Sequence, residues 1–352
     1  MKQFFIIALF APVIFLQLSS CSKDEMIKVP DSGNRKEPMI YYSGVATNSL
    51  GAGTCYWENG KKIPLNDSSV MSLETSMFID GTNIYVAGSE LNHGGSVIAK
   101  YWKNGIETRL SDGSKSVFVT GVAVDGGDIY VSGYEDKTGD GDYAAKYWKN
   151  GKEIILTNGL KNGFTSAIAI KNKNVFVAGY EGSEAKIWKN GAELDLQKRG
   201  DKSFTTGIFI SGDDLYVSGY IRTGTKTIPV YWKNGLINEL PTINGYADTK
   251  SIYVSGNDVF VAGNEYFGDQ SNTVVYTVGA YWKNGKEQLL TGPRDESNVQ
   301  GLTFFNGDVY IVGSINPWHT ARFGHWKNGE FFPVIESTYI GRLSDIFIVP
   351  GG

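Results

Sequence analysis

The segment Tyr231-Trp232-Lys233-Asn234-Gly235 is one copy of a motif that recurs along most of the chain. Successive copies lie 45, 46, 40, 44, 50 and 44 residues apart, and their tryptophans are Trp57, Trp102, Trp148, Trp188, Trp232, Trp282 and Trp326. Seven of the eight tryptophans share this register, and Trp318 lies outside it. A repeat of this period predicts one small structural unit copied along the chain.

Each copy resolves into four short strands, as the repeat around Trp232 illustrates. Apolar runs at 207–210 and 215–219 predict two strands, a third strand ends at Trp232, and a fourth covers 236–240. Asn234-Gly235 joins the last two, because both residue types accept the positive φ of a type I′ hairpin turn. Adjacent Tyr and Trp side chains point to opposite faces of a strand, so both faces of each sheet must be buried. Four-stranded sheets of this period, packed face to face around an axis, form a β-propeller.

The two ends of the repeat region each supply part of a unit. The segment 39–44 is a second strand with no first strand before it, and 344–349 is a first strand with no second strand after it. An open stack would need polar capping units, whereas pairing these segments completes one more blade. We therefore predict an all-β, seven-bladed propeller at 39–352 with four-stranded antiparallel blades, closed by the C-terminal strand completing the N-terminal blade.

In architecture, this region resembles the secreted seven-bladed propellers of the kelch-like and other tandem-repeat groups, and its Trp-x-Asn-Gly signature resembles bacterial extracellular repeat families. The resemblance covers 39–352. It implies the fold and leaves the chemistry open, because propellers host unrelated functions.

The first twenty residues have the pattern of a secretion signal. Lys2 precedes an apolar run at 4–18, which ends in Leu18-Ser19-Ser20-Cys21. A short apolar core followed by small residues is typical of a cleavable signal. Its end resembles the bacterial lipobox, which implies a lipoprotein signal at 1–20 and acylation of Cys21 with palmitate-type chains. The alternative is an ordinary signal or an uncleaved anchor with an incidental cysteine.

The segment 21–38 is polar and without periodicity, which predicts a flexible tether. Ser22-Lys23-Asp24-Glu25 resembles the surface-export tag of Bacteroidetes lipoproteins. The expected location is therefore the cell envelope, as an outer-membrane lipoprotein exposed at the surface. The lipid anchor is then the only contact with the membrane.

Composition excludes several classes of protein. The formal net charge is −4 and the sequence pI is about 5.6, whereas a nucleic-acid surface needs clustered excess Lys and Arg, so we expect no nucleic-acid partner. The cysteines are Cys21 and Cys55 alone, which rules out a disulfide framework or a four-thiolate zinc site. Cys55 lies in a predicted strand and is expected to be an inert buried thiol.

Binding residues concentrate on variable loops held by a rigid scaffold, so we expect the site on the face that carries the second-to-third-strand loops and the loops between repeats. The aromatic and histidine candidates on this face are Tyr134, Tyr180, Tyr220, Tyr266, Trp318 and His319. Exposed aromatics around an entrance suit a glycan or a protein ligand, and the alternative for them is local packing. We expect non-catalytic binding of such a ligand.

Two further possibilities stay open at the level of sequence. Asp136, Asp140 and Asp142 alternate as oxygen ligands of Ca²⁺ do, without the full EF-hand pattern, so calcium is the one candidate cofactor. Sialidase boxes, a Gly-x-Ser-x-Gly elbow and a phosphate loop are absent from the sequence. A carbohydrate-active enzyme remains an alternative, because carboxylates from different repeats can form a site, and the candidates are Glu90, Glu135, Glu181, Glu265, Asp295 and Glu296. A structural or adhesive surface module is the third alternative.

Overall fold

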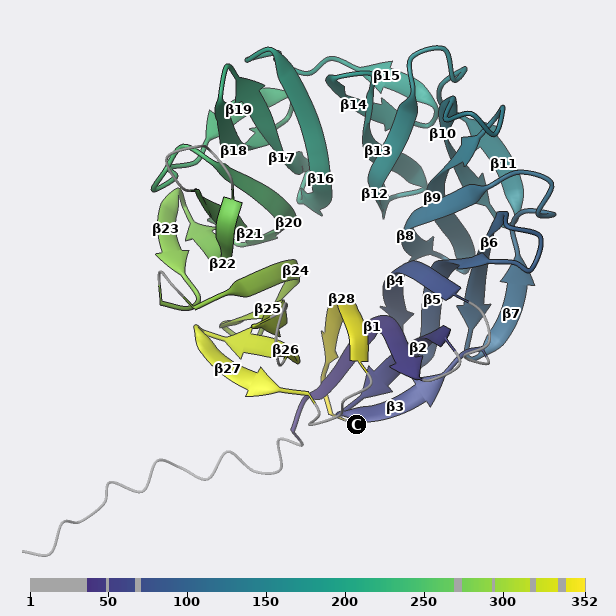
Figure 1. The fold of residues 1–352 in the computed structure, drawn as a ribbon, viewed down its shortest axis with the longest axis horizontal. Helices are drawn as coiled ribbons and strands as arrows, with labels where there is room; N and C mark the ends of the chain where they lie inside the picture. The colour runs from purple at the N-terminus through teal and green to yellow at the C-terminus, as the bar shows by residue number, and fades with distance from the viewer. Residues whose placement is uncertain are drawn as a thin grey trace, which may run out of the picture. The chain divides into compact units, whose positions relative to one another are not determined.

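The computed structural model of the chain describes residues 37–48, 51–66, 71–268, 274–292, 295–316, 321–334 and 340–351 (Figure 1). Residues 37–352 form one compact unit. Every regular element in the described ranges is a β-strand, which confirms the all-β prediction. None of the described residues belongs to a helix of the length and apolarity that a membrane crossing requires.

The strands follow the predicted grouping in fours. Those before residue 200 are β1 (Met39–Asn48), β2 (Gly51–Glu58), β3 (Lys61–Pro64), β4 (Met71–Asp80), β5 (Asn83–Leu91), β6 (Val97–Lys103), β7 (Ile106–Arg109), β8 (Val117–Asp125), β9 (Asp128–Asp136), β10 (Tyr143–Lys149), β11 (Lys152–Ile155), β12 (Gly163–Lys171), β13 (Asn174–Glu181), β14 (Glu184–Lys189) and β15 (Ala192–Leu194). Those after it are β16 (Lys202–Ser211), β17 (Asp214–Thr223), β18 (Lys226–Lys233), β19 (Leu236–Glu239), β20 (Ala247–Ser255), β21 (Asp258–Gly268), β22 (Val274–Lys283), β23 (Lys286–Leu289), β24 (Ser297–Phe305), β25 (Asp308–Ile315), β26 (Arg322–Lys327), β27 (Glu330–Pro333) and β28 (Ile340–Val349).

These strands form six sheets, where the sequence predicts seven separate blades. Five sheets have four antiparallel strands each, namely β8–β11, β12–β15, β16–β19, β20–β23 and β24–β27. The sixth sheet has eight strands, because a single parallel pair, Ala52 with Met71, joins β2 to β4. On either side of that pair, β28-β1-β2-β3 and β4-β5-β6-β7 are each four strands wide.

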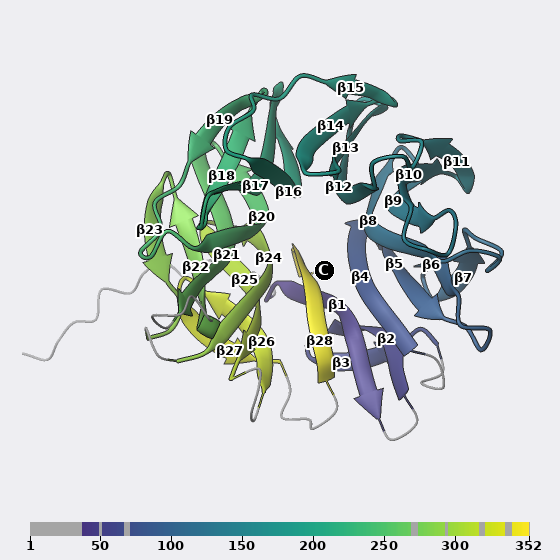
Figure 2. The ribbon, with the colours of Figure 1, turned by 45° about the horizontal axis from the view of Figure 1, so that its top comes forward.

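The sheets lie around a common centre with the first strand of each one innermost (Figures 1 and 2). The innermost strands β4, β8, β12, β16, β20, β24 and β28 contact one another in this order, and β28 also contacts β4. The C-terminal strand β28 pairs antiparallel with β1, from Met39 opposite Val349 to Ala46 opposite Ile340. This confirms the predicted pairing of the two chain-terminal strands.

The repeat motif forms the core of each sheet. The seven repeat tryptophans are each 3% exposed or less. The asparagine of every Asn-Gly turn has a φ near +50°, as the type I′ turn requires. Its side-chain oxygen accepts the backbone N–H at the start of the second strand, for example Leu215 N to Asn234 Oδ1 at 2.8 Å. The motif is therefore a scaffold element in every copy, as its repetition predicts.

The repeat glycine of the second strand, such as Gly219 in β17, is required in all repeats but one by a β-bulge in the first strand. In β16 the bulge between Thr205 and Gly207 brings the carbonyl of Phe204 against Gly219. A Cβ on Gly219 would lie 2.1 Å from that carbonyl oxygen, which no side chain tolerates. Gly88 is the exception: its nearest neighbour would be 3.3 Å away, because the bulge of β4 lies earlier in the strand.

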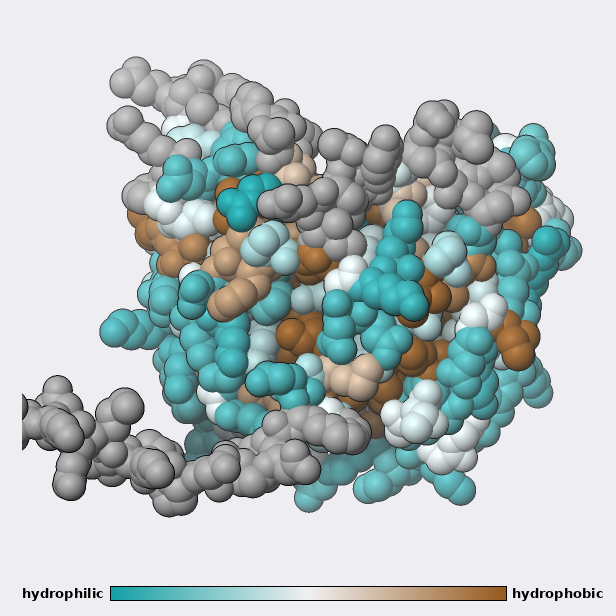
Figure 3. Space-filling model, turned by 90° about the horizontal axis from the view of Figure 1, so that it is seen from below, coloured by the Kyte–Doolittle hydropathy of each residue, from teal (hydrophilic) through white to brown (hydrophobic). Residues whose placement is uncertain are grey.

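Hydrophilic and hydrophobic residues are interspersed on the side of the molecule that Figure 3 shows. In the space-filling view of Figure 3, hydrophilic residues cover most of the described surface, and hydrophobic residues appear in patches between them. The most exposed large apolar residues include Ile106, Leu160 and Leu236, at 74%, 85% and 66% exposure. Ile106 and Leu236 lie in β7 and β19, and Leu160 lies between β11 and β12, so they are dispersed, as is ordinary for a folded surface.

Candidate functional site

The sheets have two ends, a turn face and a loop face. The turn face carries the turns between first and second strands and the Asn-Gly turns. The loop face carries the second-to-third-strand loops and the loops between sheets. A cavity of about 680 Å³ lies along the innermost strands. Its lining is polar toward the loop face, with Glu74, Thr120, Lys250 and Arg342, and aromatic toward the turn face, with Phe78, Tyr253, Phe304 and Phe347.

Hydroxyl groups link neighbouring innermost strands along this cavity. Each pair joins the bulge residue of one strand to a threonine of the next: Thr120 to Thr165 at 2.6 Å, Ser166 to Thr205 at 2.7 Å, and Thr206 to Thr249 at 2.7 Å. Thr205 and Thr249 also donate to carbonyl oxygens of Gly179 and Gly219. These contacts hold four sheets at a fixed spacing and make the cavity wall rigid.

Three of the predicted tyrosines lie together in one aromatic row at the loop face. Phenylalanine from a first strand alternates with tyrosine from a second strand, and successive ring centroids are 4.9–5.1 Å apart, in the order Phe118, Tyr134, Phe164, Tyr180, Phe204 and Tyr220. All six rings are partly buried. The row crosses the sheets β8–β11, β12–β15 and β16–β19, and the phenylalanines cover faces of the tyrosine rings.

The hydroxyl groups of the three tyrosines are the parts of this row that can still form hydrogen bonds. In the described part of the chain, the hydroxyls of Tyr134, Tyr180 and Tyr220 make no hydrogen bond, and none of them is enclosed away from solvent. Burial raises the pKa of Tyr134 and of Tyr180, and the negative charge of Glu74 raises both further. Glu74 belongs to β4, which contacts β8, so the row begins beside Glu74 at the loop-face end of the cavity, which we call the channel mouth.

Two ion pairs border the same mouth. Arg342 Nη2 lies 3.1 Å from Glu74 Oε1, and Lys250 Nζ lies 2.9 Å from Asp248 Oδ2. The second pair also contacts Tyr266, whose hydroxyl donates to Asp248 Oδ2 at 2.8 Å. A pocket of about 490 Å³ opens between Glu74, Arg342, Phe118 and Tyr134. The mouth therefore combines hydroxyl groups, carboxylates and cations around a hollow.

The structure describes some of the predicted site residues and adds others. Tyr134, Tyr180 and Tyr220 form the row, Tyr266 lies beside Asp248, and Trp318 and His319 fall outside the described residues. Sequence reasoning missed Phe118, Phe164 and Phe204, although each stands opposite a row tyrosine in the repeat register. It also missed Glu74 and Arg342, because no linear pattern joins the two ends of the chain.

The candidate calcium loop closes on itself. Asp136 Oδ1 accepts the backbone N–H groups of Gly139 at 2.8 Å and Gly141 at 3.3 Å. Within the described ranges, no three His, Cys, Asp or Glu side chains gather as metal ligands. Calcium binding by Asp136, Asp140 and Asp142 stays a prediction. Cys21 lies outside the described residues, and Cys55 is 1% exposed with its pKa raised by burial to about 12, as expected of an inert thiol.

Two titratable groups lie where β28 and β1 meet their neighbours. His325 of β26 is buried, and its Nδ1 lies 2.8 Å from the hydroxyl of Tyr42. Burial, and to a smaller extent the nearby Lys327, lower the pKa of His325 to about 4. Burial raises the pKa of Asp345 to about 6, although Asp345 accepts backbone N–H groups of Met77 and Ile346.

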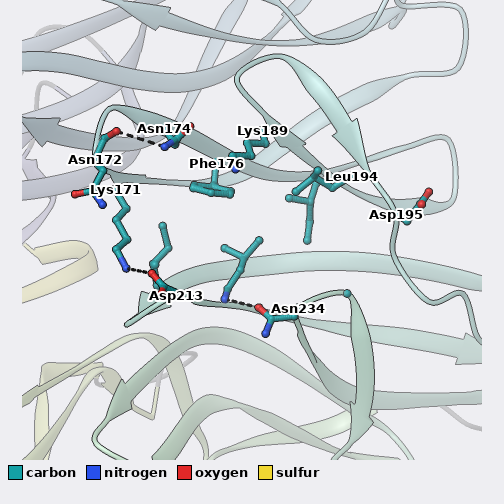
Figure 4. Close-up of a pocket in the computed structure, with 13 residues that line it drawn as sticks. Lys171, Asn172, Asn174, Phe176, Lys189, Leu194, Asp195, Asp213 and Asn234 are labelled. Atoms are coloured by element: carbon teal, nitrogen blue, oxygen red, sulfur yellow. Dashed lines mark hydrogen bonds and ion pairs between the residues drawn. The ribbon is translucent and has the colours of Figure 1, made fainter.

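A second hollow, of about 540 Å³, lies on the turn face between β12–β15 and β16–β19 (Figure 4). Lys171 reaches across it to Asp213, with Nζ 3.1 Å from Oδ1, and Asn234 accepts the N–H of Leu215. Lys189 lies over the ring of Phe176 at 5.4 Å. Lys189, Asn234 and Gly235 belong to the repeat motif, so this hollow is largely scaffold.

Comparisons with known proteins bear on the fold and leave the site open. No protein-family model matches the chain, and no curated protein matches it. The chain is similar to the solved acylaminoacyl peptidase of Pyrococcus horikoshii, at 10% identity and a TM-score of 0.52, over 86% of this chain and 52% of that one. It is also similar to a computationally designed protein, Ika8, at 16% identity and a TM-score of 0.48, over 88% and 90% of the two chains. The likeness to the peptidase concerns the fold alone, and this chain spans about half of that protein's length.

Proposed function

We propose that this chain is a non-catalytic glycan-binding protein, with its ligand held at the loop-face mouth of the channel. The observation that carries the proposal is a row of three tyrosines from three sheets, with hydroxyls that make no hydrogen bond, which begins at a pocket of about 490 Å³ lined by Tyr134 and the Glu74–Arg342 pair. Sugar hydroxyls both donate and accept hydrogen bonds, and this mouth offers both kinds of partner.

Rigidity of the mouth favours binding of a polar ligand. The hydroxyl contacts between innermost strands and the stacked phenylalanines fix the tyrosines before the ligand arrives. A preorganised site loses less side-chain entropy on binding than a mobile one. Because the faces of the tyrosine rings are covered, we expect their hydroxyl edges to contact the glycan, by hydrogen bonding rather than by stacking on its rings.

The same proposal includes a closed, seven-bladed propeller. Pairing of β28 with β1, together with the contacts of β28 with β24 and β4, supports closure by the C-terminal strand. The eight-stranded sheet then counts as two blades that touch at one residue pair. Closure matters to function, because it brings Arg342 of β28 to Glu74 of β4.

We place the propeller at the cell surface, as an outer-membrane lipoprotein with a tether at 21–38, in a bacterium of the Bacteroidetes type. Leu18-Ser19-Ser20-Cys21 and the following Lys23-Asp24-Glu25 support this location. Cys21→Ala should leave an uncleaved precursor without acyl labelling. Full membrane retention and unchanged labelling in that variant would overturn the anchor.

The test of binding is a glycan array screened with the full propeller, assayed for both retention and cleavage, with and without calcium. Tyr180→Phe removes one hydroxyl and keeps the aromatic row, so the retained glycan should bind roughly tenfold more weakly. Lys233→Gln on the turn face is the matched control and should bind normally. Cleavage of the glycan would favour the enzyme alternative, and equal affinity of Tyr180→Phe and wild type would remove the site assignment.

A further inference from the structure

The turn-face hollow between β12–β15 and β16–β19 lies where one repeat departs from the others. In the sheet β8–β11, Tyr130 of the second strand and Tyr147, just before the repeat tryptophan, pack together against β12–β15. The same two positions are tyrosines in β16–β19, but they are Phe176 and Ile187 in β12–β15. Ile187 is the one aliphatic residue that precedes a repeat tryptophan. This interface between sheets therefore lacks a ring that the neighbouring interfaces have.

The hollow is apolar where that ring is missing. Ile187 is 1% exposed, and the hollow that it lines measures about 540 Å³. Figure 4 shows Phe176 and Leu194 on one side of the hollow and Asp213 and Asn234 on the other. The apolar residues of its lining are Phe176, Ile187, Leu194, Ile210 and Leu215. An aromatic ring of a ligand can therefore bury apolar surface here.

The same repeat also lacks a carboxylate at the rim. The lysine after each repeat tryptophan lies over the aromatic ring of the second strand, as Lys149 does over Tyr130 at 5.3 Å and Lys189 over Phe176 at 5.4 Å. In four sheets this lysine pairs with an aspartate at the start of the second strand, at 2.8–2.9 Å. Asn174 occupies the aspartate position in β12–β15. Among the residues that the structure describes, Lys189 therefore forms no ion pair.

The other charged groups around the hollow leave Lys189 uncompensated. Lys171 Nζ and Asp213 Oδ1 lie 3.1 Å apart, so these two charges offset each other. Asp195 is exposed, and its carboxylate points away from the ring of Phe176 in Figure 4. The hollow thus combines an apolar floor with one unpaired cation at its rim.

We propose that this hollow binds a small aromatic carboxylate, with its ring against Phe176 and Ile187 and its carboxylate on Nζ of Lys189. Such a ligand supplies both groups that β12–β15 lacks: the ring of the repeat tyrosine and the carboxylate of the repeat aspartate. The ring gains from burial, and the carboxylate gains a charge-assisted hydrogen bond.

Both parts of the ligand are needed. An inorganic anion would pair with Lys189 and leave the apolar lining in contact with water. A neutral arene would cover the lining and leave the ammonium without a partner. The hollow lies on the turn face, at the opposite end of the sheets from the proposed glycan site, so the two sites are separate.

The experiment titrates the full chain with sodium benzoate and with benzamide, its neutral analogue, by calorimetry. Benzoate should bind saturably, and benzamide at least roughly tenfold more weakly. Asn174→Asp gives Lys189 the aspartate of the other repeats and should weaken benzoate binding by a similar factor. Ile187→Tyr restores the repeat ring and should abolish binding. The matched control is Asn83→Asp, the same exchange in β4–β7, where Tyr101 is present, and it should bind as the wild type does.

Crystals soaked with 4-iodobenzoate locate the ligand independently of affinity. An anomalous iodine peak is expected in the hollow beside Phe176 and should be absent in Ile187→Tyr. Absence of saturable benzoate binding would overturn the proposal, and a crystal peak alone would then be binding at crystal concentration only. Equal affinity for benzoate and benzamide, or equal benzoate affinity of wild type and Asn174→Asp, would also overturn it. None of these outcomes affects glycan binding at the channel mouth, which Tyr180→Phe tests.

Discussion

The two ends of the sheets differ in how closely the repeats agree. At the turn face, the Asn-Gly turn and its hydrogen bond to the second strand are the same in every repeat. At the loop face, the residue after the repeat glycine is tyrosine in three neighbouring sheets and is Val45, Ser89, Asn264 or Ser314 in the others. Features that recur in every sheet support the fold, and the departures gather where we propose the ligand binds.

The difference also shows how one scaffold carries a local site. Hydrogen-bonded turns fix one end of every sheet, so substitutions at the other end change the surface without changing the architecture. The row from Phe118 to Tyr220 occupies three sheets, and Glu74 and Arg342 lie beside its first members, Phe118 and Tyr134. The turn-face residues therefore stabilise the fold, whereas the loop-face residues are those that we propose recognise the ligand. Each of the following substitutions tests this division.

Substitution of a repeat glycine should cause the largest loss of stability. Gly219→Ala places a Cβ 2.1 Å from the carbonyl oxygen of Phe204, so the strands must separate, and unfolding should become easier by about 3 kcal/mol. Gly88→Ala is the matched control, with its nearest atom at 3.3 Å. Chemical denaturation measures both variants. Similar losses of stability in the two variants would show that the bulge is not the reason why glycine is required at position 219.

Acid sensitivity should come from the seam between β26 and β1. The folded pKa of His325 is lowered to about 4, below its usual 6.5, so the unfolded chain binds a proton first as the pH falls. The contribution of His325 to stability should therefore be lost between about pH 6.5 and pH 4, and it amounts to roughly 3 kcal/mol. The raised pKa of Asp345 acts in the opposite direction, because its protonated form favours the folded state below about pH 6.

His325→Tyr restores the residue found before most of the repeat tryptophans. Its free energy of unfolding, followed from pH 7 to pH 4, should fall less than that of the wild type. An identical fall in both proteins would assign the acid sensitivity to other groups.

A smaller effect is expected at the turn face. Asn234→Ala removes the hydrogen bond to the N–H of Leu215 and puts alanine at a φ of +49°. The expected cost is about 1–2 kcal/mol, with glycan affinity unchanged. Asn234→Gly keeps the backbone conformation accessible and isolates the side-chain hydrogen bond. Weaker glycan binding by Asn234→Ala at a temperature where it is folded would contradict the division between the two faces.

The sequence predicts the repeats much better than it predicts the site. Trp232, Asn234 and Gly235 act through local hydrogen bonds and burial, so their roles follow from spacing and residue type. The pairing of β28 with β1 is also predictable, because each terminal repeat lacks strands that the other supplies.

The site depends on contacts that have no linear trace. Tyr180 is recognisable as a loop-face aromatic, whereas its enclosure by Phe164 and Phe204 depends on how neighbouring sheets pack. Glu74 meets Arg342 only because β28 contacts β4.

Hydrogen exchange with and without the retained glycan tests the central claim most directly, because it locates the ligand without a substitution. Peptides that cover Phe118, Phe164 and Phe204 at the loop face should exchange more slowly in the complex, together with the start of β4 around Glu74. Peptides that cover the Asn-Gly turns should be unchanged. Protection confined to the turn-face peptides, with none at the row of tyrosines, would contradict the account.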